Sequence, residues 1–485
     1  MRLIIRYTCV LISVLFTFIQ FGCNSAKKNS PPPNIVFILA DDLGWPDVSC
    51  YGQDLWNTPG IDRLAKEGIR FTNAYAASPV CSATRASILT GKYPHRLSFT
   101  GITPHMAEGT QYKLPDNAEV YAAYMKKTLS ANTSTFAYEL RNAGYSTCFI
   151  GKWHLGGTKN QAKEMGFDHI HHFDPSNSQF RFNENGRFTT DLKGDAAIKF
   201  LEESKDKPFF MFFSANAVHT KIAASEDYIN HYKEQGLPEK GPWNATYAGF
   251  VQHLDDNVER ILDKLDELKI SRNTVVFFFS DNGGRGLNIS KNDPLRGGKG
   301  QLYEGGIREP LIIRWPDVIP SGKKIDVPVM SMDFYPTFLD IAGLDLQPEN
   351  HKDGISLLPI LKNDRKIDAD RDKFFWHHPH YSSVAVPHSA IRMKDWKLIK
   401  YYTSYRRVWD SEKNKAIELQ SAPLIELFDL KNDFRESKNL SSEHPEIVKE
   451  LKKELEMHLD ELNAEMPKKN PEYDPSKPQK GLFVY

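Results

Sequence analysis

Short runs of apolar residues alternate with amphipathic segments through most of the chain. The clearest runs are residues 35–40 (IVFILA), 147–150 (TCFI), 209–214 (FFMFFS), 274–280 (TVVFFFS) and 311–315 (LIIRW). We interpret them as buried parallel strands, because both faces of such strands are covered and the apolar run is continuous. Residues 243–268 repeat apolar side chains at helical spacing. The alternation predicts an α/β fold with a large, mostly parallel sheet sandwiched by helices.

The pattern changes towards the C-terminus. Residues 389–402 (SAIRMKDWKLIKYY) predict two short strands around a turn at Lys394 and Asp395, and residues 425–430 predict another strand. Residues 444–462 carry apolar residues on one helical face. These elements predict a smaller C-terminal α+β subdomain with an antiparallel sheet and a helix. We expect a main domain over residues 34–375 and the subdomain over 376–485, with the boundary near residues 365–385.

The first residues have the composition of a targeting segment. Arg2 and Arg6 precede an apolar stretch from about residue 7 to 21, and Gly22-Cys23 follows it. The stretch is short for a membrane span, which favours an export signal over residues 1–23 and export to the periplasm or cell surface. Gly-Cys resembles a bacterial lipoprotein processing site, which predicts lipidation of Cys23. The alternatives are cleavage nearby or an uncleaved anchor. Residues 24–33 are polar and Pro-rich, as in a linker.

Charge and cysteine content narrow the class of protein. Lys plus Arg and Asp plus Glu are both 62, so the formal net charge is zero. This balance gives no reason to expect nucleic acid, whose binding requires clustered positive charge. Beyond the signal, Cys50, Cys81 and Cys148 lie in an oxidising compartment, and three cysteines make a poor disulfide framework. Cys50 and Cys148 either pair or stay free thiols.

Polar residues follow four of the predicted strands. They are Asp41 and Asp42, Lys152 and His154, Asn216 and His219, and Asp281 and Asn282. In open α/β sheets, ligands bind at the carboxyl ends of the strands, so these side chains are expected at one shared edge. The alternative is that each pair only forms a turn, for which Asp and Asn are ordinary residues. Four such ends together favour a shared site.

The acidic residues of this group have the chemistry of a cation site. Asp41, Asp42, Asp281 and Asn282 supply hard oxygen ligands, which suit calcium or magnesium better than zinc. Three carboxylates crowded together would repel one another without a cation. The alternative is that the pairs cap helices.

A candidate nucleophile precedes a predicted helix. Residues 84–90 predict that helix, with Gly91 as its stop, so Cys81 is expected just before a helix N-terminus, where free N–H groups favour an anion. Arg85 lies one turn further on and can bind a tetrahedral oxyanion with its guanidinium fork. The segment therefore predicts a nucleophile beside an anion pocket. A cysteine in such a place is otherwise usually a small buried residue.

These residues carry a family resemblance. Residues 81–85 (CSATR) resemble the C-x-P/A-x-R signature of the type I sulfatases of the alkaline-phosphatase superfamily, in which the cysteine becomes formylglycine. Residues 89–96 (LTGKYPHR) continue it, and residues 151–156 (GKWHLG) resemble the second sulfatase signature. Residues 295–310 and 426–433 also look like family blocks. The similarity runs from about residue 34 to 440, and Ala83 replaces the commoner proline.

The resemblance implies a role for each site residue. One calcium ion would be held by Asp41, Asp42, Asp281, Asn282 and an oxygen on modified residue 81. Arg85, Lys152 and Lys299 would contact the sulfate, although the glycines around Lys299 are also compatible with a plain flexible turn. The hydrated formylglycine would attack sulfur, His219 would protonate the leaving alcohol, and His154 would deprotonate residue 81 to expel sulfate.

The substrate is less well defined by the sequence. An exported sulfatase is expected to act on a sulfated glycan after a formylglycine-generating enzyme has matured Cys81. Candidate substrate-binding residues are His378 and His380 within residues 376–381 (WHHPHY), and a second candidate group is His169, His171 and His172. Either group could instead be packing or surface histidines. Two other functions stay open: a phosphonate monoester or phosphodiester hydrolase of the same superfamily, and a catalytically silent glycan-binding lipoprotein.

Overall fold

The computed structural model describes residues 31–103, 114–174, 187–286, 289–362, 371–382, 384–410 and 415–481. The predicted export signal, with Cys23, lies outside the described residues. From Pro33 onward the chain forms one compact unit. Within the described part, no helix combines the length and apolar character needed to cross a membrane.

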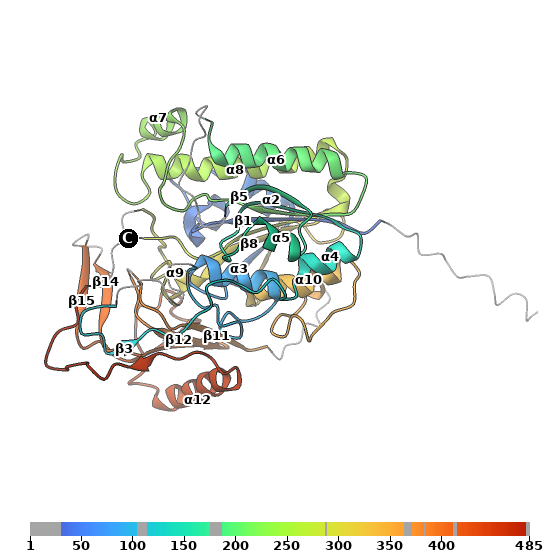
Figure 1. The fold of residues 1–485 in the computed structure, drawn as a ribbon. Helices are drawn as coiled ribbons and strands as arrows, with labels where there is room; N and C mark the ends of the chain where they lie inside the picture. The colour runs from blue at the N-terminus through green and yellow to red at the C-terminus, as the bar shows by residue number, and fades with distance from the viewer. Residues whose placement is uncertain are drawn as a thin grey trace, which may run out of the picture. The chain divides into compact units, whose positions relative to one another are not determined.

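The large sheet has the strand order β10-β2-β8-β7-β1-β6-β4-β5, with β9 beside β2 (Figure 1). Its strands are β1 (Asn34–Ala40), β2 (Ile69–Tyr75), β4 (Ser146–Lys152), β5 (His169–Asp174), β6 (Phe209–Ser214), β7 (Thr274–Ser280), β8 (Arg308–Arg314), β9 (Lys323–Ile325) and β10 (Val329–Met330). β1 lies between β6 and β7 and is parallel to both. The predicted large, mostly parallel sheet is therefore confirmed.

One strand runs against the prediction. The apolar run at residues 311–315 lies in β8, which is antiparallel to both β7 and β2. The prediction that it is a parallel strand was wrong, because a continuous apolar run reports coverage of both faces and not strand direction. The chain returns from the end of β7 directly into β8, so the segment between them stays at one edge of the sheet.

Helices cover both faces of the large sheet (Figure 1). On one face, α2 (Pro59–Glu67), α6 (Thr189–Ser204) and α8 (Ala245–Glu267) pack on side chains such as Ile38 and Phe278. On the other, α3 (Cys81–Thr90), α4 (Phe136–Asn142) and α10 (Phe334–Ile341) pack on Phe37 and Phe277. The helix predicted over residues 243–268 corresponds to α8. Burying the ring of Phe37, Phe277 or Phe278 contributes about 1.5–3 kcal/mol of stability each.

Four further helices of the described chain precede the second sheet. They are α5 (Lys159–Glu164), α7 (Glu226–Glu234), α9 (Glu304–Ile307) and α11 (Leu358–Leu361), with 3-10 turns at Trp45–Asp47, Ser49–Tyr51, Ser271–Asn273 and Ser331–Asp333. Helix α9 joins the segment after β7 to the start of β8, so it lies at the same edge of the sheet as the polar residues that follow the strands.

The C-terminal part forms a second, antiparallel sheet, β11-β12-β13-β16. Its strands are β11 (Lys373–His378), β12 (His388–Met393), β13 (Trp396–Tyr401) and β16 (Ile425–Asp429); smaller pairs join β14 (Arg406–Asp410) to β15 (Lys415–Leu419) and β3 (Val120–Tyr121) to β17 (Lys468–Lys469). Helix α12 (Pro445–Glu461) lies beside this sheet in Figure 1 and buries Leu451, Leu455 and Leu459. The predicted C-terminal α+β subdomain is confirmed, and β11 spans the predicted boundary between residues 375 and 376.

A buried group of charges joins the second sheet to α9. The Lys397 ammonium of β13 lies 2.9 Å from Glu304 Oε1 and 2.9 Å from Glu436 Oε1, and all three side chains are fully buried. The Glu304 backbone N–H also donates to Glu436 Oε2 at 2.6 Å. The two sheets are thus linked by ion pairs as well as by the apolar cluster that includes Tyr75, Leu302 and Trp376.

Helix α3 begins earlier than the sequence suggested. Cys81 is its first residue and not the residue before the helix, because Val80 already has the extended backbone of an N-cap. Gly91 ends the helix as predicted, with φ +64°, and donates its N–H to Ser87 O. Cys50, Cys81 and Cys148 are all free thiols.

Candidate active site

The polar residues that follow the strands converge at the carboxyl edge of the large sheet. Asp41 and Asp42 follow β1, and Asp281 and Asn282 follow the neighbouring β7. The Asp42 N–H donates to Asp281 Oδ1 at 3.2 Å, and Asn282 Nδ2 donates to Asp42 Oδ1 at 2.8 Å. Lys152 comes to the same place from the end of β4. The parallel arrangement of β1, β4, β6 and β7 explains this convergence.

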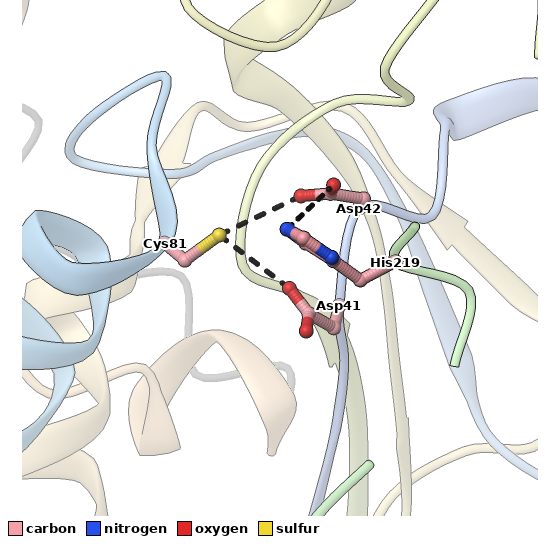
Figure 2. Close-up of side chains that lie close together, drawn as sticks. All are labelled: Asp41, Asp42, Cys81 and His219. Atoms are coloured by element: carbon pink, nitrogen blue, oxygen red, sulfur yellow. Dashed lines mark hydrogen bonds and ion pairs between the residues drawn. The ribbon is translucent and has the colours of Figure 1, made fainter. Parts of the chain in front are cut away.

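Cys81 and three polar side chains surround one point (Figure 2). Ligand atoms of Asp41, Asp42, Cys81 and His219 all lie within 4.8 Å of one another. Cys81 Sγ is 3.4 Å from Asp41 Oδ1 and 3.5 Å from Asp42 Oδ1, and His219 Nε2 is 3.5 Å from Asp42 Oδ2. Helix α3 therefore presents its first side chain to the acidic end of β1.

Three cations balance the three carboxylates. Lys152 Nζ lies 2.7 Å from both oxygens of Asp41. Lys299 Nζ lies 2.7 and 2.8 Å from the Asp42 oxygens and 3.3 Å from Cys81 Sγ. The third cation is a guanidinium from α3, described next. All of these groups sit in a buried setting, where charge-assisted contacts are strong.

Arg85 contacts groups at the ends of β4, β6 and β7. Its Nε donates to Asp281 Oδ2 at 2.8 Å, and its Nη1 donates to Lys152 O at 2.8 Å and to Ser214 Oγ at 2.6 Å. Ser214 ends β6 and donates in turn to Lys152 O at 2.6 Å. Ser214 is not among the site residues predicted from the sequence. The available signal was a hydroxyl that ends an otherwise apolar run.

Burial and the charged side chains of the site set the pKa values of its carboxyl groups. Burial alone would raise the pKa of Asp41, but Lys152, His219, Arg85 and Lys299 outweigh it and hold that pKa well below its usual value. Burial together with the Asp41 carboxylate raises the pKa of Asp281 to about 6. Burial also raises the pKa of the Cys81 thiol well above its usual value. An unmodified Cys81 is therefore a protonated thiol here.

The two histidines of the site differ in their surroundings. His219 Nδ1 donates to Thr220 O at 2.6 Å, which leaves Nε2 as the atom that faces Asp42. Burial, with Lys299, lowers the pKa of His219 to about 4, so its ring is neutral near pH 7. His154 has φ +58°, and its buried Nδ1 has no hydrogen-bond partner among the described residues.

The donor set fits a hard divalent cation. Asn282 Oδ1 is a buried acceptor without a hydrogen-bond partner among the described residues, and it belongs to the amide whose nitrogen bonds Asp42. Together with the carboxylates of Asp41, Asp42 and Asp281, it supplies the oxygen ligands that calcium prefers. These four residues and residue 81 are the ones that would hold the ion.

The comparison with known proteins identifies the family. Residues 33–344, more than half of the chain, match the family described as Sulfatase. The chain belongs to the sulfatase family. It is a type I sulfatase with an alkaline-phosphatase-like fold, and hence a sulfuric ester hydrolase. Residues 298–465 of this sulfatase also match the family described as N-sulphoglucosamine sulphohydrolase, C-terminal.

Similar proteins cover most of the chain. A sulfatase of Formosa agariphila is 29% identical over 518 residues, which are 90% of this chain and 89% of that protein. The human N-acetylgalactosamine-6-sulfatase is 32% identical over 375 residues, 70% of this chain and 67% of that protein. The structure of Ps i-CgsB in complex with k-i-k-neocarrahexaose has a TM-score of 0.72 and 27% identity, covering 88% of this chain and 92% of that one.

The histidines predicted to bind the substrate are buried in the C-terminal part of the sulfatase and contact Thr100. His378 and His380 are buried, with exposed fractions of 0% and 1%. His380 Nε2 lies 2.8 Å from Thr100 Oγ1, and His378 Nδ1 lies 3.3 Å from Thr100 O. The second candidate group, His169, His171 and His172, lies on the edge strand β5. Substrate binding by either group stays a prediction.

Proposed function

We propose that this sulfatase hydrolyses sulfate esters on a sulfated glycan, with formylglycine made from Cys81 as nucleophile and one calcium ion as cofactor. The observation that carries the proposal is the meeting of Cys81 with Asp41, Asp42 and the two lysines at one buried point. The similarity to an N-acetylgalactosamine-6-sulfatase and to a structure with a bound neocarrahexaose supports a sugar substrate.

The cationic side chains would bind and orient the sulfate group. When bound, calcium supplies a positive centre that neutralises the carboxylates and polarises oxygens next to residue 81. Lys152 and Lys299 reach the same point from two sides, so their ammonium groups can hold the equatorial sulfate oxygens in the transition state. Arg85 would fix Asp281 and the end of β4 and add positive charge.

The histidines would move the protons. The neutral His219 ring carries its proton on Nδ1, which donates to Thr220 O, so Nε2 must first take up a proton; the imidazolium so formed would donate that proton from Nε2 to the leaving alcohol. His154 would accept a proton from residue 81 when sulfate leaves. His154 is buried, and its Nδ1 has no hydrogen-bond partner in the part of the chain that the structure describes, which supports a neutral ring that can accept a proton.

Maturation and location complete the proposal. Cys81 is fully buried in the folded chain, so the formylglycine-generating enzyme would act before this site closes. The export signal at residues 1–23, the linker at 24–33 and lipidation of Cys23 would place the enzyme in the periplasm or on the cell surface. Its contact with a membrane would then come only through the signal or the lipid. Residues 34–375 would form the catalytic domain and 376–485 the C-terminal subdomain.

The proposal is tested by sulfate release from a panel of defined sulfated mono- and oligosaccharides, with a phosphonate monoester and a phosphodiester included. The protein is co-produced with a formylglycine-generating enzyme and compared with Cys81→Ala, each with and without a calcium chelator. Cys148→Ala removes another buried free thiol and serves as the matched control. The mass of the tryptic peptide that ends at Arg85 reports the modification.

Release of sulfate that requires both Cys81 and calcium, and that survives Cys148→Ala, is the expected result. Equal release by Cys81→Ala would exclude the nucleophile, and equal release with chelator would exclude the cofactor. Turnover of the phosphorus esters without any release of sulfate from the panel would assign the site to the other hydrolase class.

A further inference from the structure

The segment that carries Lys299 is held by three different parts of the molecule. We call residues 295–304 the Lys299 loop. The Lys299 N–H donates to Gly284 O at 3.0 Å, next to the residues that follow β7. The Gly300 N–H donates to Pro79 O at 2.8 Å, close to the start of α3. The third set of contacts comes from the C-terminal sheet.

His388 makes the most direct of these contacts. The Leu302 N–H donates to His388 Nε2 at 3.0 Å, and His388 Nδ1 lies 2.7 Å from Val386 O. A backbone N–H can only donate and a carbonyl can only accept, so the ring must be the neutral form with its proton on Nδ1. The ring is 1% exposed and stacks on Tyr401 at 5.4 Å. Both the tautomer and the orientation of His388 are therefore fixed.

Other contacts hold the loop from the same side. Gln301 Nε2 donates to Val384 O at 3.0 Å. Tyr303 Oη donates to Glu426 Oε2 at 2.6 Å, and Tyr401 Oη donates to Tyr303 Oη at 3.0 Å. Tyr401 thus both supports the His388 ring and contacts the loop, which makes the C-terminal sheet a continuous backing for residues 301–303.

Support from the C-terminal sheet matters because the side chain of Lys299 does not by itself determine where its ammonium group lies. A lysine side chain is flexible and carries its charge at the end of four carbons, so its reach depends on where the backbone is held. Lys299 Nζ must meet both Asp42 and residue 81. We propose that His388 is a positioning residue, which holds the Lys299 loop from the C-terminal sheet so that the ammonium group meets the sulfate. This proposal rests on the proposed function.

The test is a double-mutant cycle on kcat/KM for sulfate release. His388→Leu removes the acceptor of the Leu302 N–H, and His388→Gln restores an acceptor near the place of Nε2. Both are measured alone and with Lys299→Ala. The matched control is His253→Leu, because His253 Nε2 is also a buried acceptor of a backbone N–H, that of Ser225 at 3.1 Å, on α8.

We expect His388→Leu to lower kcat/KM about 10- to 100-fold, since a displacement of about 1 Å can cost that much. We expect His388→Gln to recover most of it. In the Lys299→Ala background the same His388→Leu change should cost less than about threefold, because the group it positions is gone. Equal losses in both backgrounds, or an equal loss in His253→Leu, would overturn the proposal.

Hydrogen exchange separates this proposal from the proposed function. We expect faster exchange of the peptide covering residues 296–304 in His388→Leu than in the unaltered protein, and no change there in His253→Leu. Unchanged protection of that peptide would overturn the role of His388 whatever the activity. If the unaltered protein released no sulfate from any substrate, the proposed function would fail, while the exchange experiment would still decide whether His388 holds the loop.

Discussion

Replacing Lys397 by methionine should destabilise the protein far more than its single positive charge suggests. Lys397 lies between Glu304 and Glu436 with all three side chains fully buried. Methionine keeps most of the length and volume of the lysine stem, so the substitution removes the charge without opening a large cavity. Two buried carboxyl groups then lose the cation that they share, a change that typically costs 3–5 kcal/mol.

The loss of stability in Lys397→Met comes from the change in protonation of the two carboxyl groups. Burial would raise the pKa of Glu304, but Lys397, Arg308 and Arg392 outweigh it and lower that pKa to about 2. Burial raises the pKa of Glu436 to about 7, so this group is only about half ionised at pH 7. Without Lys397, Glu304 must become protonated on folding. From its usual pKa of 4.5, at 1.36 kcal/mol per pH unit, this costs about 3.4 kcal/mol at pH 7.

The sign of the pH dependence follows from linkage. In the unaltered protein, the lowered pKa of Glu304 contributes stability that is present above about pH 4.5 and is lost as the pH falls towards 2. In Lys397→Met, the pKa of Glu304 in the folded state is raised, so stability is lost as the pH rises above 4.5. The destabilisation should therefore be about 2.7 kcal/mol smaller at pH 5 than at pH 7.

The measurement is urea denaturation of both proteins at pH 7 and pH 5. The matched control is Lys400→Met on the same strand, where Lys400 Nζ lies 2.6 Å from Glu456 Oε1 at the partly exposed surface. This pair should contribute less than about 1 kcal/mol at either pH. An equal loss in Lys397→Met at both pH values would contradict this prediction, because it would mean that Glu304 stays ionised beside Arg308.

Two further predictions concern the metal and the end of α3. Calcium at about 100 times its Kd should stabilise the unaltered protein by about 2.7 kcal/mol, and Asp281→Asn should remove most of that gain. Thermal unfolding with calcium and with chelator measures both proteins. An equal gain in the variant would exclude Asp281 as a ligand. Gly91→Ala should lower the melting temperature well beyond Gly343→Ala, since both have positive φ but only the new Cβ at residue 91 meets another atom, 2.5 Å from His351 Cβ. Equal effects would show that backbone strain alone decides.

The sequence predicted the centre of the fold and of the site for a physical reason. Strands such as β1 and β7 are buried on both faces, so their apolar runs are continuous, and the first polar residue after each run marks the strand end. Asp41 and Asp281 were found in this way, and the structure places both at one edge. This prediction of strand ends and site residues depends only on residues that are adjacent in sequence.

The parts that the sequence did not predict depend on contacts between distant segments. The direction of β8 follows from where the segment after β7 re-enters the sheet, which no apolar run encodes. Ser214 acquires its place through Arg85 and Lys152. His388 meets the Lys299 loop only because the second sheet packs against it, although His388 and Leu302 are 86 positions apart in the sequence. Such residues look ordinary when read in sequence.

The reversed strand β8 also bears on how such a protein can diversify. Since the chain leaves the sheet after β7 and re-enters at β8 on the same edge, both ends of the intervening segment are pinned next to the acidic residues. Residues can be added or removed between Asn282 and the Lys299 loop without shifting any strand, and doubling the length of a flexible loop costs only about 0.6 kcal/mol in closure entropy. New surface beside the reacting group is thus open to evolution while the sheet beneath it stays unchanged.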